Sequence, residues 1–169
     1  MKNYFKHITV WLTLLAVLTI MIAIFCLSAQ TVDKSVETSG HFVDAVIKLF
    51  YPDFDNLSAA DREAALDSVT HVIRKLAHFT EYAALGFFLA LHFHELRSKL
   101  NFGIKYVWAA VIGVIYAASD ELHQFFVPGR GPGVKDVLID GAGALTGIAV
   151  MLILLRLFCR KNADEGKIY

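Results

Sequence analysis

Three short runs of ionisable side chains lie in this chain, each at one end of an apolar stretch. The first contains His78 and Glu81, the second Asp120 and His123, and the third Asp140. Imidazole and carboxylate groups are the usual side chains for acid–base catalysis and for holding divalent cations. Ionisable groups at membrane depth are costly and therefore mark candidate functional sites. We predict that these five residues are the catalytic groups of one site.

The first run has helical spacing that gathers its polar groups on one side. His78 and Glu81 are three residues apart, and Lys75 and Tyr82 lie within about one turn of His78. We expect Lys75 and Tyr82 to contact a ligand. A simpler interpretation makes Tyr82 an interfacial anchor and Lys75 a snorkelling side chain. That interpretation does not explain Glu81.

The second run places His123 and Gln124 three and four residues after Asp120, with Glu121 on a neighbouring face. A carboxylate beside an imidazole orients the ring and raises its basicity, as general-base chemistry or metal ligation requires. We expect Gln124 to contact a ligand. The alternative is a polar cluster that only hydrogen-bonds membrane helices to one another.

The segment after the second run offers a cation and two carboxylates. Arg130 lies in a loop rich in proline and glycine, and its planar guanidinium suits a phosphate or a carboxylate. Asp136 is positioned to cap the following helix, and Asp140 lies one turn deeper. We expect Arg130 and Asp136 to bind a ligand. Gly143 and Gly147 have the small-xxx-small spacing of closely packed membrane helices.

The composition indicates what must position these residues. Of 169 residues, 56% are hydrophobic and 19% charged, which predicts an all-α polytopic membrane protein. The formal net charge is zero, so nothing favours nucleic-acid binding. Spanning about 30 Å of hydrocarbon takes roughly 20 helical residues. We predict one domain, residues 1–169, as a bundle of four transmembrane helices at 8–27, 75–94, 106–126 and 136–158.

The segments outside the spans include an outer loop, 28–74, and a cytoplasmic tail, 159–169. Apolar residues from Phe42 to Phe50 recur at helical spacing, which predicts an extra amphipathic helix between the first two spans. Ser58 and Asp61 resemble a capping box that begins another helical stretch. Basic residues cluster on one side of the predicted spans, which favours cytoplasmic termini and places all three polar runs on the outer face. These basic residues are Lys2, Lys6, Arg97, Lys99, Lys105, Arg156, Arg160 and Lys161.

The cofactor requirement stays open at this point. Imidazole and carboxylate ligands from three helices suit a divalent metal such as Zn²⁺, Mn²⁺ or Mg²⁺, but no familiar metal-binding motif is present. Nucleophilic catalysis has weaker support, because Ser28 and Ser119 are the nearby hydroxyls and neither lies in a G-x-S-x-G turn. Acid–base chemistry needs fewer assumptions.

Three motifs in this order resemble the VanZ-like family. They are R-K-x-A-H-F-x-E-Y from Arg74, S-D-E-x-H-Q-x-F-x-P-G-R from Ser119 and D-x-x-x-D-x-x-G from Asp136. The resemblance implies a multi-pass protein of the bacterial cytoplasmic membrane and cell envelope. A named member of the family is linked to resistance to the glycopeptide teicoplanin. The resemblance supplies no molecular activity.

Two functional hypotheses follow. The first is an outward-facing polar pocket that binds or acts on a lipid-linked envelope molecule, such as a cell-wall precursor. The second is a non-enzymatic membrane module whose polar cluster only packs the helices and which masks an antibiotic target. Whether the chain is an enzyme stays open between them.

Overall fold

The computed structural model describes residues 2–96, 101–131 and 133–165. All regular secondary structure in these residues is helical, as predicted. The elements in chain order are α1 (Lys2–Ser28), α2 (Val32–Phe50), the short 3-10 helix η1 (Phe54–Asn56), α3 (Ala59–Glu95), α4 (Phe102–Gln124) and α5 (Val134–Glu165). The predicted tail is therefore helical in its backbone as far as residue 165, and residues 166–169 lie outside the described part.

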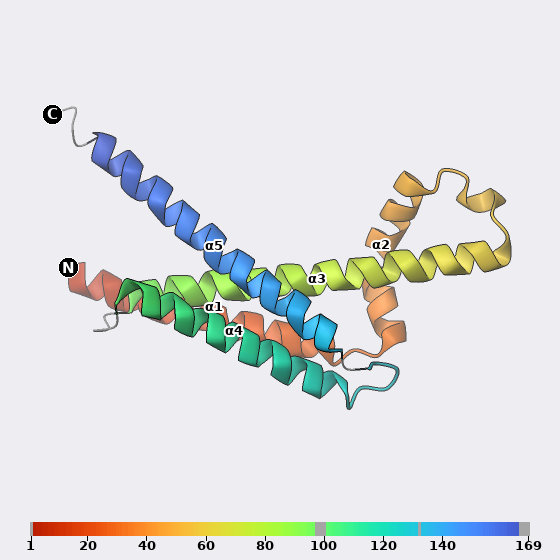
Figure 1. The fold of residues 1–169 in the computed structure, drawn as a ribbon, viewed down its shortest axis with the longest axis horizontal. Helices are drawn as coiled ribbons and strands as arrows, with labels where there is room; N and C mark the ends of the chain where they lie inside the picture. The colour runs from red at the N-terminus through yellow and green to blue at the C-terminus, as the bar shows by residue number, and fades with distance from the viewer. Residues whose placement is uncertain (1, 97–100, 132, 166–169) are drawn as a thin grey trace.

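The helices α1, α4 and α5 pack around the second half of α3 (Figure 1). The helix α5 crosses the second half of α3 and then diverges from it. The helix α2 crosses the first half of α3. The start of α1 and the end of α5 lie at the same end of the bundle. The turn from α1 to α2 and the loop from α4 to α5 lie at the other end, where the polar runs are found.

Within the described residues, three helical segments are long and apolar enough to cross a membrane: His7–Ser28, Phe102–Gln124 and Val134–Phe158. They correspond to the first, third and fourth predicted spans. The predicted second span, 75–94, is the second half of α3 and does not reach the same hydropathy. Polar side chains such as His78, Glu81 and His92 lower its average.

The helix α3 continues without a break through the predicted outer loop. It begins after Ser58, whose hydroxyl accepts a hydrogen bond from the Asp61 amide at 3.2 Å, which confirms the predicted cap. Its 37 residues extend about 55 Å at a rise of about 1.5 Å per residue. The predicted outer loop is therefore largely helical. Val43 and Ile47 of α2 pack on Ala65 and Val69 of α3 in a small second core.

The α3–α5 crossing depends on glycines at which the two backbones touch. A Cβ atom on Gly86 would overlap the Ala144 carbonyl, and one on Gly147 would overlap the Ala83 carbonyl oxygen. A Cβ atom on Gly143 would also overlap the Phe79 carbonyl oxygen, although less severely. The packing role predicted for Gly143 and Gly147 is confirmed.

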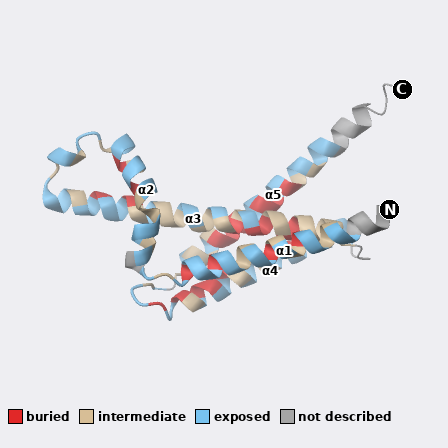
Figure 2. Cartoon of the chain, turned by 180° about the vertical axis from the view of Figure 1, so that it is seen from behind, coloured by how far each residue is buried: buried red, intermediate tan, exposed pale blue. Residues whose placement is uncertain are grey.

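Buried residues concentrate where the four long helices pack, whereas α2 and the first half of α3 are mostly exposed (Figure 2). The main core includes Tyr82, Leu85, Ala109, Ala144 and Met151. Many large apolar side chains point outward, among them Trp11, Leu15, Val107, Ile115 and Leu145. A surface of this kind is expected of a protein embedded in a bilayer.

Replacing Gly147 by alanine is expected to destabilise the bundle, because the new methyl group would force α3 and α5 apart. Overpacking of this kind costs about 1–3 kcal/mol. A fall in Tm of the purified protein in lipid nanodiscs measures the effect. Gly40→Ala on α2 is the control, since a methyl group at that position would meet no other atom within 4 Å. An unchanged Tm for Gly147→Ala would contradict the close crossing.

Candidate functional site

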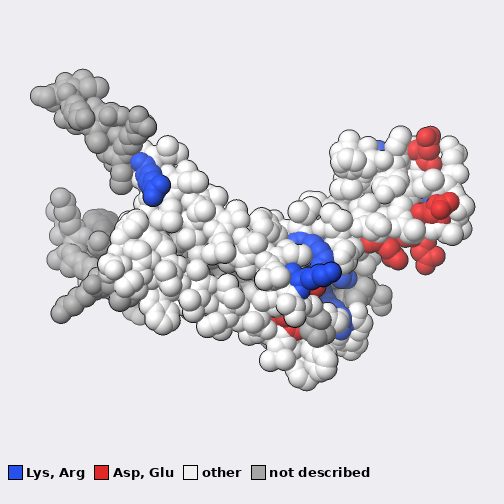
Figure 3. All heavy atoms as spheres, viewed as in Figure 1, with Lys and Arg blue, Asp and Glu red and all other residues white. Residues whose placement is uncertain are grey.

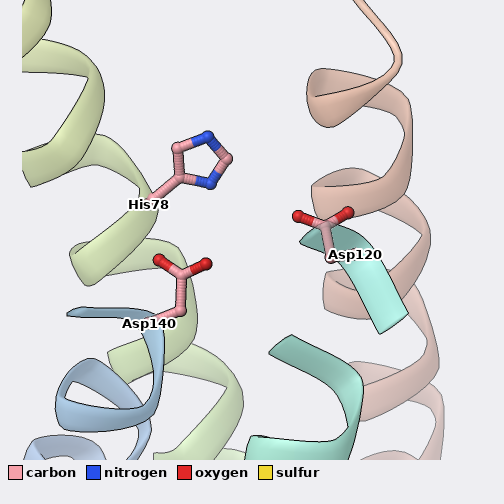
Figure 4. A group of neighbouring side chains, drawn as sticks. All are labelled: His78, Asp120 and Asp140. Carbon is pink, nitrogen blue, oxygen red and sulfur yellow. The ribbon is translucent and has the colours of Figure 1, made fainter. Parts of the chain in front are cut away.

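Three helices bring His78, Asp120 and Asp140 to one point inside the bundle. His78 comes from α3, Asp120 from α4 and Asp140 from α5, and their side chains point into a shared space (Figure 4). One candidate ligand atom from each residue lies within 4.8 Å of the other two. The two carboxylates are almost fully buried, with Asp120 3% and Asp140 2% exposed.

One oxygen of Asp120 is held by partners from two helices. Asp120 Oδ2 accepts a hydrogen bond of 2.7 Å from the Ser28 hydroxyl at the end of α1. It also accepts one of 3.1 Å from the Gln124 amide, one turn farther along α4. These two bonds fix the orientation of the carboxylate, so α1 helps to build the site although it supplies none of the three clustered residues.

Gln124 connects this carboxylate to the loop between α4 and α5. Its amide nitrogen also donates to Glu121 Oε1 at 3.1 Å, and its carbonyl oxygen accepts from Arg130 Nη1 at 3.2 Å. The other Glu121 oxygen accepts from the Gly133 amide at 3.0 Å. Gly129 turns the loop with a φ of 79°, which favours glycine. The loop is thus tied to α4 at both Arg130 and Gly133.

Glu81 and Tyr82 flank His78 on the inner side of α3. His78 Nδ1 lies 3.7 Å from Glu81 Oε2, at the i, i+3 spacing expected from the sequence. Tyr82 is fully buried and its ring lies beside that of Tyr116, with centroids 6.1 Å apart. Tyr82 therefore lies inside the bundle and is not an interfacial anchor.

His123 lies next to this cluster but packs differently from the predicted Asp120 pair. Its ring stacks on Phe25 of α1, with centroids 4.3 Å apart. Asp120 is instead bonded to Ser28 and Gln124. Both residues thus contact the end of α1, Asp120 through the Ser28 hydroxyl and His123 through the Phe25 ring.

Lys75 and Asp136 form an ion pair between α3 and the first turn of α5. The capping position predicted for Asp136 is wrong, because α5 already begins at Val134. Its carboxylate lies within the first turn, where it also complements the helix dipole. The charges of Lys75 and Asp136 compensate each other, and the pair closes one side of the site.

Seven of these side chains have a buried polar atom with no hydrogen-bond partner among the described residues. The atoms are His78 Nδ1, Glu81 Oε2, Tyr82 Oη, Asp120 Oδ1, His123 Nε2, Arg130 Nε and Asp140 Oδ2. Buried polar groups in proteins are usually hydrogen-bonded, and leaving one unpaired costs about 1–3 kcal/mol. Buried atoms of this kind are satisfied by water or by a ligand, and here they gather in one region.

Two hollows meet at this cluster. The inner pocket, of about 50 Å³, includes Arg74, His78, Glu121, Arg130, Asp136 and Asp140 in its lining. The outer pocket, of about 200 Å³, lies toward α2 and includes Gln30, Ser35, Thr38, Arg74, His78 and Arg130. Arg74, His78 and Arg130 line both pockets. A larger open groove of about 1030 Å³ between α2 and α3 contains none of the three clustered residues.

Cations surround the mouth of the inner pocket. Figure 3 shows basic side chains gathered where α5 begins beside α3, and acidic side chains at the far end of α3 and the segment preceding it. Burial lowers the pKa of the Arg130 guanidinium and the nearby Arg74 lowers it further, whereas the carboxylates of Asp120, Glu121 and Glu81 raise it. A guanidinium remains protonated in proteins. Arg74 and Arg130 therefore place two positive charges beside buried acids.

The structure thus brings together nine of the ten predicted site residues directly and places His123 at the edge of the group. Three further residues of the same site, Ser28, Arg74 and Glu121, were noted in the sequence but not included among the predicted site residues. Arg74 and Glu121 stand inside the motifs quoted above, and Ser28 ends the first apolar stretch. Their polar side chains near the ends of apolar helices were the signal that could have assigned them to the site.

The comparisons with known proteins agree with the motifs. The model of the VanZ/LLP1 family matches residues 13–156, which covers most of each of the four long helices and the whole site. Neither the curated proteins nor the solved structures gave a significant match. Because the family match covers most of the sequence, the chain belongs to the VanZ/LLP1 family.

Proposed function

We propose that this chain is a four-span protein of the bacterial cytoplasmic membrane whose polar pocket binds the anionic head group of a lipid-linked envelope molecule. Bound there, the head group faces the acid–base side chains His78, Glu81, Asp120, His123 and Asp140. Lys75, Tyr82, Gln124, Arg130 and Asp136 hold it or shape the pocket. The single domain covers residues 1–169.

The second half of α3 is the fourth crossing in this proposal. Its residues Tyr82, Leu85, Leu89 and Ala90 belong to the main core, and it lies along α1 and α4, which are apolar enough to span a bilayer. Four crossings place both termini on one side, which we assign as cytoplasmic. Lys105 and Arg156 lie toward that end. The side chains of the other basic residues used for this orientation lie outside the described part.

The observation that carries the head-group proposal is the shared wall of the two pockets. Arg74 and Arg130 line both the inner and the outer pocket, so an anion in the outer pocket would meet two guanidiniums. Guanidinium groups bind phosphate through paired, charge-assisted hydrogen bonds. At about 200 Å³, the outer pocket is smaller than the roughly 300–1,000 Å³ of typical ligand sites. This size favours a phosphate over a whole glycan.

The buried polar atoms support a binding site over a cluster that only packs helices. A structural cluster would pair its polar atoms, because each unpaired one destabilises the fold. Here Glu81, Asp120 and Asp140 each keep a buried oxygen that has no partner among the described residues. The cost is understandable if these atoms serve a ligand or a proton transfer.

Arg130→Gln is expected to weaken binding of a short-chain polyprenyl phosphate to the protein in nanodiscs. Losing a charge-assisted hydrogen bond costs about 1.5–3 kcal/mol, which raises Kd roughly tenfold or more. Native mass spectrometry or fluorescence titration measures the change. Arg156→Gln is the matched control, because Arg156 lies near the opposite end of α5. Equal Kd values for the two variants, or equal binding of the uncharged polyprenol, would refute the head-group proposal.

Expression of the chain in a teicoplanin-susceptible bacterium is expected to raise the inhibitory concentration of teicoplanin. This expectation carries over to the present chain the link between one named family member and that antibiotic. Glu81→Ala should abolish the increase while expression and Tm stay unchanged, because Glu81 is partly exposed and serves the pocket. Loss of the folded protein in this variant would favour the structural module instead.

A further inference from the structure

We infer that His78, Asp120 and Asp140 together bind one divalent metal ion that takes mixed nitrogen and oxygen ligands, such as Zn²⁺ or Mn²⁺. The inference rests on the arrangement of these side chains and does not depend on the proposed head-group function.

The distances suit a metal site that closes around its ion. Metal–ligand bonds of about 2.0–2.2 Å place two ligands about 3.3–3.6 Å apart at a tetrahedral angle and about 4.4 Å apart on opposite sides of the ion. The three candidate atoms lie within 4.8 Å of one another. Small side-chain rotations therefore bring them into ligand distance. The three residues come from three different helices, so they can approach an ion from separate directions (Figure 4).

Two of the three ligands have a free oxygen deep inside the protein. Asp140 is 2% exposed and Asp120 is 3% exposed, and Asp140 Oδ2 and Asp120 Oδ1 lack a hydrogen-bond partner among the described residues. Both carboxylates point toward the space that they share with His78 (Figure 4). Two buried carboxylates this close repel each other unless a cation or a proton lies between them.

The surrounding groups orient Asp120 in the way that metal sites require and place a carboxylate near His78. Ligating carboxylates are usually held by hydrogen bonds at the other oxygen, and ligating histidines commonly direct the second ring nitrogen at a carboxylate. Ser28 and Gln124 hold Asp120 Oδ2, which leaves Oδ1 free. Glu81 Oε2 lies 3.7 Å from His78 Nδ1.

The charge balance leaves a place for a dication. The site contains four carboxylates outside the Lys75–Asp136 pair, namely Glu81, Asp120, Glu121 and Asp140. Arg74 and Arg130 supply two positive charges. The two carboxylates in excess need a proton or a cation close by, and a divalent ion among His78, Asp120 and Asp140 would supply it. The inner pocket, at about 50 Å³, exceeds the roughly 10–15 Å³ that one water needs, so an ion can keep one or more water ligands.

Metal titration of the chelator-treated, full-length protein in nanodiscs tests the inference. Calorimetry with Zn²⁺ and with Mn²⁺ alone is expected to give one ion per chain. His78→Asn and Asp140→Asn should each raise Kd at least tenfold. The controls His41→Ala and Asp44→Asn replace the same residue types on the exposed face of α2 and should bind as the wild type does. No stoichiometric binding by the wild type, or equal binding by all variants, overturns the site.

Pulsed electron paramagnetic resonance of Mn²⁺ bound to the wild-type protein gives an answer even if a variant fails to fold. A nitrogen coupling from a directly bound imidazole is expected, and it should persist in Asp44→Asn. Its absence from the wild type overturns the assignment of His78 as a ligand. No polyprenyl phosphate is present in either experiment, so failure here leaves the head-group proposal standing, and failure of the polyprenyl phosphate titration leaves the metal site standing.

Discussion

The close crossing of α3 and α5 is the constraint on which the site depends. Gly86, Gly143 and Gly147 let the two backbones touch. Without a hydrophobic force between lipid-exposed helices, such contacts and interhelical polar bonds hold the bundle together. The crossing sets the rotation of both helices, and that rotation faces His78 toward Asp140. A packing feature made of the smallest side chains thus determines where ionisable groups meet.

A second set of contacts fixes the remaining wall. The hydrogen bonds from Ser28 and Gln124 orient Asp120, and Gln124 and Glu121 together tie the α4–α5 loop to the end of α4. The loop therefore carries Arg130 to a defined position above the cluster. Buried networks of this kind are stabilising when satisfied and costly when not. In this site, Asp120 Oδ2 accepts two hydrogen bonds, whereas Oδ1 has no partner among the described residues.

Much of this could be predicted from the sequence, and the exceptions have physical reasons. Alternating spans put the three polar runs at one end, and the Ser58 cap follows from local spacing. The orientation of His123 toward Phe25 could not be predicted, because it depends on how α4 is rotated against α1. Glu121 was expected on a neighbouring face, yet the returning loop covers that face and encloses it. Sequence periodicity indicates the face of a helix but not which neighbour covers it.

The length of α3 also bears on how the protein sits at the membrane surface. A helix of about 55 Å exceeds the roughly 30 Å hydrocarbon layer by about 25 Å. Its projecting part begins with Asp61, Glu63 and Asp67, whereas Arg74 and Lys75 lie where it enters the bundle. Along α3 the order is therefore an acidic start, a basic band and then an apolar half that packs in the main core, so one unbroken helix carries three zones of different polarity.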